Sequence, residues 1–177
     1  IGSFGAKFLS FFLVRLYSKF IDTAGVGVKE LIETTANFII PVVTFCMADA
    51  IIRYGLKKKY SKKKVFTSAA VMILIGLTGL ALLSPLFNLI SYLDGYGFLL
   101  YLYIFCSCFR SLCSNFVRAE GYVKLFAADG IFTTLSLLVF NIIFIAILKM
   151  GVTGFLISVI LSDFVSGMAL TIIAGLW

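Results

Sequence analysis

Ionisable side chains inside long apolar runs are the residues of this sequence best suited to chemistry. The chain has 177 residues, of which 62% are hydrophobic and 13% are charged. Arg110, Asp129 and Asp163 each interrupt an apolar run. A charge at the centre of a membrane helix costs about 2.5 to 3.5 kcal/mol, so these side chains must face protein or water. They predict recognition of a charged ligand or of a coupling ion.

Covalent catalysis has little support in the composition. The sequence contains no histidine, and its eight carboxylates are scattered. The four cysteines lie in apolar runs without CxxC spacing, which is typical of small core residues: Cys46, Cys106, Cys108 and Cys113. We therefore expect no enzyme activity, no metal site, no cofactor and no nucleic-acid partner.

The apolar runs predict an all-α polytopic membrane protein. The mean hydropathy is +1.12, and the runs are continuous rather than alternating in the short segments of a β-barrel. At about 20 residues a span, we expect residues 1–177 to form a single bundle of six transmembrane helices. The predicted spans are 3–21, 29–53, 65–91, 97–118, 124–148 and 152–176. Their short connections predict antiparallel neighbours.

Lysine and arginine counts predict the orientation. The second and fourth connections with their flanks carry nine basic residues, namely Arg53, Lys57, Lys58, Lys59, Lys62, Lys63, Lys64, Arg118 and Lys124. The other connections carry Lys29 and Lys149, with Lys19 at a helix end. The positive-inside rule then places both termini and the loop 54–64 in the cytoplasm. The six lysines of that loop are also candidate contacts for anionic lipids.

Polar stripes run along the first, second and fourth predicted helices. At 100° per residue, one arc of the fourth helix holds Tyr103, Ser107, Arg110, Ser111, Ser114 and Arg118. The first helix has a comparable arc with Ser3, Lys7, Ser10, Arg15, Ser18 and Lys19. The second has Glu30, Glu33, Thr34, Asn37, Pro41, Thr44 and Ala48. We expect these stripes to face the interior of the bundle.

Two interpretations of the buried charges remain open. As structural ion pairs, Lys19 would meet Glu30, Arg15 would meet Glu33, and Asp49 would meet Arg53 at i and i+4. Folding about residue 121 leaves Asp129 about 6 Å from Arg110 along the helix axis, within an arginine's reach. As ligand groups, Lys7, Arg15, Arg110 and Arg118 would form a net-positive cavity.

Such a cavity predicts an anionic, phosphate-bearing substrate, because guanidinium groups bind phosphate oxygens bidentately. Asp129, Asp163 and Glu33 are then candidates either for proton or ion coupling or for structural pairing. On the last helix, Gly154, Ser158, Ser162 and Ser166 recur every four residues and predict close helix packing. Tyrosines near helix ends, such as Tyr17, are typical of interfacial anchors.

Stretches along nearly the whole chain follow a familiar pattern, namely residues 2–14, a turn at Gly27, residues 48–54 before a basic loop, and residues 116–130, 141–144 and 151–158. In these stretches the sequence resembles the Wzx-type polysaccharide biosynthesis flippases of the multidrug/oligosaccharidyl-lipid/polysaccharide exporter superfamily. Arg53 and Arg118 fall where family members often carry arginine. Arg15 departs from the pattern, since relatives tend to have proline there.

The resemblance implies one lobe of a MATE-like transporter with two six-helix lobes, so we expect this chain to be the amino-terminal lobe, with the second lobe missing. It implies a bacterial inner-membrane protein that flips a polyprenyl-pyrophosphate-linked oligosaccharide by alternating access. The second lobe would come from the same chain or from a second copy. Two alternatives remain open, a cation-extruding multidrug antiporter of the same superfamily and a non-transporting scaffold subunit.

Overall fold

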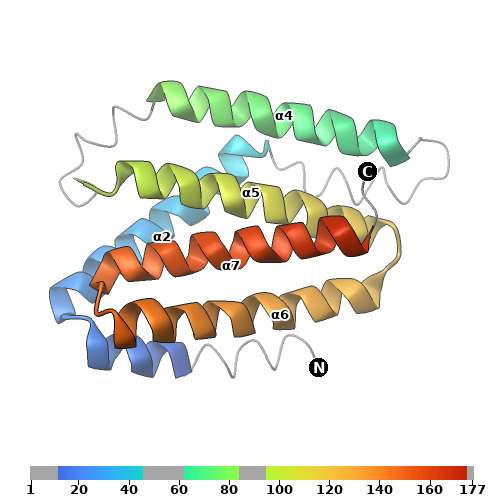
Figure 1. Ribbon diagram of the computed structural model, residues 1–177. Coiled ribbons are helices and arrows are strands. Elements are labelled where there is room, and N and C mark those ends of the chain that lie inside the picture. The colour runs from blue at the N-terminus through green and yellow to red at the C-terminus, as the bar shows by residue number, and fades with distance from the viewer. Residues whose placement is uncertain (1–11, 46–61, 84–94, 175–177) are drawn as a thin grey trace.

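The computed structural model describes residues 12–45, 62–83 and 95–174, and its regular elements in these ranges are all helices (Figure 1). Residues 12–20 are helical. The following elements are α2 (Thr23–Val43), α4 (Lys62–Leu83), α5 (Gly97–Ala119), α6 (Val123–Asn141), the π-helical segment η3 (Ile142–Ile147) and α7 (Gly151–Ile173). The prediction of an all-α chain is confirmed for the described residues.

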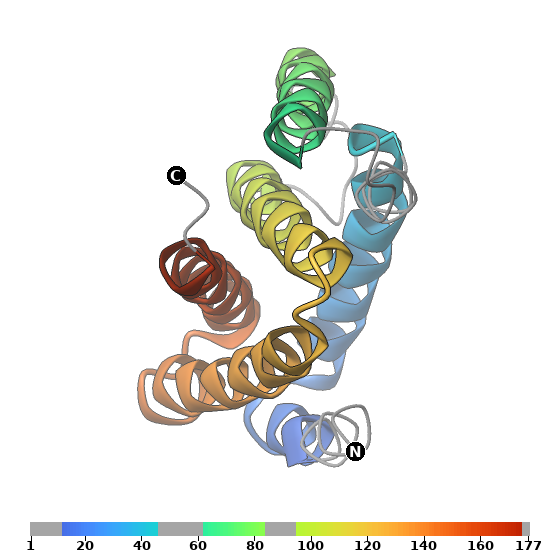
Figure 2. The same ribbon diagram turned by 90° about the vertical axis from the view of Figure 1, so that its right-hand side faces the viewer.

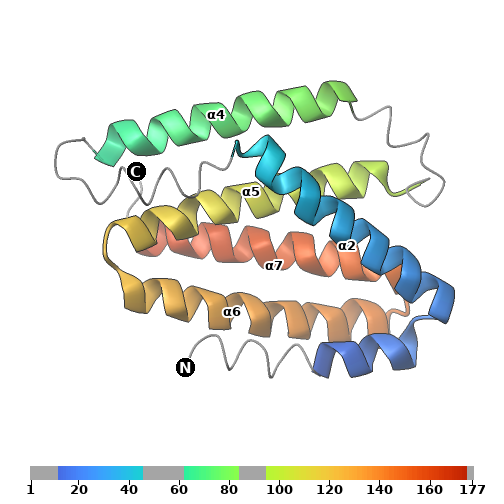
Figure 3. The same ribbon diagram turned by 180° about the vertical axis from the view of Figure 1, so that it is seen from behind.

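The helices pack lengthwise around a centre formed by α5 and α7, the most extensive pair. Figure 2, an end-on view, places α4 beyond α5 on one side and α6 on the side of α7. In Figure 3, α2 crosses obliquely over α5 and α7, and the helical residues 12–20 lie beside α6. The α5–α6 and α6–α7 neighbours are antiparallel, as their short connections predict.

Four of the described helical segments are long and apolar enough to cross a membrane: 65–82, 97–119, 123–147 and 151–173. The second and fourth of these are half buried inside the bundle, while only 11% of the best window in 123–147 is buried. Such apolar exposure suits lipid and not water. Four helices of this length and composition are typical of a membrane-embedded protein. The predicted second span is not among the four, and α2 carries Lys29, Glu30 and Glu33.

Helix boundaries follow the sequence closely at three connections and depart from it at one. Helix α5 begins at Gly97, and left-handed glycines mark the next two connections, with φ of 88° at Gly121 and 58° at Gly151. The connection expected between the predicted spans 3–21 and 29–53, however, is helical from Thr23. A Cβ at Gly25 would lie 2.8 Å from a methyl carbon of Ile21, so glycine serves close packing there rather than a turn.

Three cysteines of α5 belong to the core, as predicted, while Cys46 lies outside the described residues. Cys106, Cys108 and Cys113 are free thiols with exposures of 3%, 0% and 1%. Because a buried thiol is inaccessible to charged reagents, we expect these three to resist a membrane-impermeant maleimide in the folded protein and to react after denaturation. Peptide mass spectrometry after labelling measures this. Labelling of any of the three in the native protein would contradict their placement.

Candidate functional site

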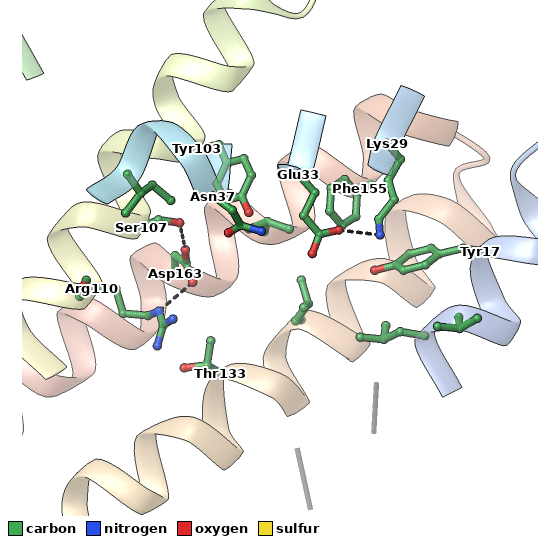
Figure 4. Close-up of a pocket in the computed structure, with 16 residues that line it drawn as sticks. Tyr17, Lys29, Glu33, Asn37, Tyr103, Ser107, Arg110, Thr133, Phe155 and Asp163 are labelled. Atoms are coloured by element: carbon green, nitrogen blue, oxygen red, sulfur yellow. Dashed lines mark hydrogen bonds and ion pairs between the residues drawn. The ribbon is translucent and has the colours of Figure 1, made fainter. Parts of the chain in front are cut away.

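A cavity of about 510 Å³ opens between the helical residues 12–20, α2, α5, α6 and α7. This volume lies within the usual range of ligand pockets, about 300 to 1,000 Å³. Figure 4 shows Arg110, Asp163 and Ser107 at one end, Lys29, Tyr17 and Phe155 at the other, and Glu33 and Asn37 between them. Phe155 and Asp163 are eight positions apart on α7, which corresponds to about 12 Å of helix.

Arg110 is the central cation of the first end. Its Nε donates a hydrogen bond to Asp163 Oδ1 at 2.8 Å, and Ser107 Oγ donates to the other oxygen of the same carboxylate. The Arg110 side chain is 30% exposed and that of Asp163 only 8%. The guanidinium therefore keeps part of its surface toward the cavity while its charge is already paired.

Asp129 is a second carboxylate on the same guanidinium. Its Oδ2 lies 3.5 Å from Arg110 Nη1 and accepts a 3.2 Å hydrogen bond from Ser114. Ser166 donates to its other oxygen. With only 3% of its side chain exposed, Asp129 joins α5, α6 and α7 in one buried polar network. Breaking such a network strands a charge in a low-dielectric interior.

Lys29 is the central cation of the other end and is also buried, with 7% of its side chain exposed. Its Nζ lies 2.6 Å from Glu33 Oε2 and 2.9 Å from Glu30 Oε1. The rings of Tyr17 and Phe155 are each centred 4.9 Å from the same nitrogen. Carboxylates and aromatic faces both stabilise a desolvated ammonium, so this position holds a fully paired lysine.

The structure brings together only some of the residues proposed from the sequence. The contact between Arg110 and Asp129 is confirmed, and Asp163 joins them. Arg15 and Arg118 are exposed, and neither lines the cavity. Lys7 and the Asp49–Arg53 pair lie outside the described residues. Of the predicted anion-binding set, Arg110 alone is shown at the cavity.

The described lining of the cavity carries no net charge, in contrast to the net-positive cavity expected from Lys7, Arg15, Arg110 and Arg118. Lys29 and Arg110 contribute two positive charges, and Glu33 and Asp163 contribute two negative charges. The physical reason is that Arg15 and Arg118 turn outward while the carboxylates turn inward. Glu30 and Glu33 form ion pairs with Lys29, whereas Lys19 and Arg15 were the partners expected for them.

Sequence reasoning missed Lys29 and Tyr17 as site residues. Lys29 stands at the predicted start of a span, where a lysine usually reaches water, and Tyr17 resembles an interfacial anchor. The structure buries both, at 6% and 7% exposure. The available signal was the i,i+4 spacing of Lys29 and Glu33, which places the two charges on one helix face.

The small-residue stripe of α7 has the predicted packing role. Gly154, Ser158, Ser162 and Ser166 are all buried. Ser162 Oγ donates to the Thr133 carbonyl at 2.8 Å, and Thr133 Oγ1 donates to Ser166 Oγ at 2.9 Å. Close approach of α6 and α7 is thus combined with hydrogen bonds that hold the register of Asp129 and Asp163.

Fold and site together define a helical membrane protein with a charged cavity inside its bundle. A scan against protein-family models finds no match, and searches of the curated proteins and of the solved structures find none either.

Proposed function

We propose that this chain is the amino-terminal lobe of a bacterial inner-membrane flippase that moves a polyprenyl-pyrophosphate-linked oligosaccharide by alternating access. The observation that carries the proposal is the cavity between α2, α5, α6 and α7, with charged side chains near the middle of helices that are otherwise apolar. Polar groups at this depth are expensive and are typical of a transport pathway. Lining hydroxyl and amide groups, such as Ser111, Thr133 and Asn37, match the hydrogen-bonding needs of a sugar head group.

Arg110 is the proposed contact for the phosphate groups. Asp163 and Asp129 occupy its Nε and Nη1, so a bound phosphate competes with carboxylates rather than filling an empty positive cavity. Competition of this kind favours release as well as binding, since the guanidinium is never left unpaired. No covalent step is required.

Exposed polar residues of α2 support the proposal that this helix contacts a second lobe. Glu30, Thr34 and Pro41 follow the helical repeat and are exposed, and the Glu30 side chain is 64% exposed. Asn37, on the same stripe, is exposed and also lines the cavity. A polar stripe of this kind on a membrane helix must face water or protein. The proposed second lobe, from the same chain or from another copy, would complete the pathway there.

Basic residues at one end of the bundle support a cytoplasmic orientation for that end. The rings of Phe66 and Phe116 are centred 5.0 Å apart, so the start of α4 lies beside the end of α5. Lys62–Lys64, Arg118 and Lys124 therefore share one end, while Lys29 and Lys149 lie toward the other (Figure 1). By the positive-inside rule the first end is proposed to be cytoplasmic, where its lysines would contact anionic lipids.

The test is export by a strain that lacks its own flippase and carries the full-length gene. We expect Arg110→Ala to reduce surface polysaccharide severely when export is divided by the amount of protein found in the membrane. Arg110→Lys, which keeps the charge but not the planar pair of guanidinium donors, should give an intermediate amount. Lys149→Ala, an exposed change at a connection, serves as the control and should export normally. Undiminished export by Arg110→Ala would overturn the proposed role of Arg110.

A second candidate, a cation-extruding antiporter of the same superfamily, is favoured by one observation. Three carboxylates, Glu33, Asp129 and Asp163, lie in or beside a cavity whose described lining has no net charge. Acidic groups attract organic cations. Drug sensitivity of an overexpressing strain separates the two functions, because an antiporter lowers sensitivity to organic cations and a flippase leaves it unchanged.

A further inference from the structure

The Lys29 cluster lies at one end of the cavity. We define this cluster as Lys29, Glu30, Glu33, Tyr17 and Phe155. Its members come from three separate helices: Tyr17 from residues 12–20, the charged residues from α2, and Phe155 from α7. The rings of Tyr17 and Phe155 also meet edge to face, with centroids 5.7 Å apart. One ammonium thus holds the three helices together (Figure 4).

Apolar packing lies beyond the cluster, toward the connections at 21–22 and 148–150. Ile21 and Val152 are buried, at 7% and 8% exposure. A Cβ built on Gly25 would lie 2.8 Å from Ile21 Cγ2 and 3.5 Å from Val152 Cγ2. Buried apolar residues from the same three helical regions therefore pack close to Gly25 beyond the cluster.

The two charged clusters of the cavity differ in how firmly they are enclosed. The Arg110 carboxylate partners are 3% and 8% exposed and tie α5, α6 and α7 together. The Lys29 carboxylate partners are 64% and 38% exposed. Because Glu30 and Glu33 lie on α2 with Lys29, the ammonium keeps both ion pairs when α2 moves away from α7, so this cluster opens at lower cost than the other.

We propose that Lys29 is the latch of a gate at this end of the cavity. In the described conformation the latch is closed, and a ligand in the cavity passes this end only after the ammonium and the Tyr17 ring leave Phe155 on α7. The moving part is the pair formed by residues 12–20 and α2, and the fixed part is the α5–α6–α7 unit. That this gate serves transport rests on the proposed function. The contacts of Lys29 with Tyr17 and Phe155 are present in this chain whatever it transports.

Cysteine accessibility tests the latch in the full-length protein without any cargo. Leu137 lines the cavity from α6, so Leu137→Cys places a reporter on the fixed part. Membrane vesicles of both orientations are treated with a membrane-impermeant methanethiosulfonate, and labelling is compared with the same protein lacking the reporter. We expect Lys29→Met to raise the labelling rate at least about tenfold from the side of the 21–22 connection only.

Lys19→Met is the matched control. Lys19 is an exposed lysine near the same end, with its Nζ 5.5 Å from the Phe20 ring centre, and its loss should leave labelling unchanged from both sides. Glu33→Gln, which keeps a hydrogen-bond acceptor, provides a milder variant should Lys29→Met fail to accumulate, and should raise labelling from the same side by a smaller factor.

Unchanged labelling in both Lys29→Met and Glu33→Gln would overturn the latch, and so would an equal rise from both sides, because general loosening has no side. The assay contains no oligosaccharide. Its failure is therefore distinct from failure of the proposed flippase, which the export of Arg110→Ala tests separately.

Discussion

Replacing Arg110 with methionine is expected to lower the free energy of unfolding by about 3–5 kcal/mol, the usual cost of breaking a buried ion pair by removing one partner. Arg110 is the cation between Asp163, at 2.8 Å, and Asp129, at 3.5 Å. Without it, the buried carboxylates of Asp163 and Asp129, with 8% and 3% side-chain exposure, repel each other and have no cation to balance their charge. Denaturant or thermal unfolding of the purified protein in detergent measures the loss.

Neutralising one carboxylate should cost less than removing the arginine. Asp163→Asn and Asp129→Asn each leave the guanidinium with one counter-charge, and each is expected to cost about 1–3 kcal/mol. The double variant strands the guanidinium and should return the cost to that of Arg110→Met. Arg118→Met is the control, because Arg118 is exposed on the same helix with its Cζ 5.3 Å from the Phe126 ring centre. Equal stability of Arg110→Met and Arg118→Met would show that the network contributes nothing.

The network shows which part of the site could be predicted from the sequence. Helical periodicity places Tyr103, Ser107, Arg110 and Ser111 on one face of α5, and these four residues line the cavity. The short connection near Gly121 fixes how α5 and α6 lie side by side, which is why the Arg110–Asp129 contact was foreseeable. Local rules were sufficient because both relations involve one helix or one short connection.

The Asp163 partnership depends on the register between α5 and α7, which no short connection sets. At their interface, a Cβ on Gly167 would lie 2.7 Å from a ring carbon of Phe109, so the glycine lets the two helices approach at one height. Periodicity alone does not reveal which glycine of α7 meets which aromatic residue of α5. Tertiary packing decides it.

Residues 12–20 show a second limit of sequence reasoning. The helical wheel groups Arg15, Ser18 and Lys19 correctly, and all three are exposed, but the expectation that this group faces the bundle is wrong. Amphipathicity shows which residues share a face and not which face the rest of the fold covers. Leu13 and Tyr17 are buried there instead, and Tyr17 reaches Lys29.

Close packing of α2 against α4 leads to the other large expected effect. A Cβ on Gly76 would lie 2.0 Å from the carbonyl oxygen of Val43 and 2.8 Å from its carbonyl carbon. These are backbone atoms in the last turn of α2, so a rotamer change cannot relieve the overlap and the helices must move apart. Gly76→Ala is therefore expected to destabilise the protein by at least about 1–3 kcal/mol, the typical cost of overpacking.

Gly79→Ala in the same helix is the matched control and should have the opposite sign. A Cβ at Gly79 meets nothing within 4 Å, so the helix propensity of alanine should stabilise the protein by up to about 1 kcal/mol. Thermal unfolding of the two variants in the same detergent makes the comparison. Because both changes add one methyl group to α4, a difference between them reports the Val43 contact and not helix propensity, and equal melting temperatures would rule out the close approach of α2 and α4.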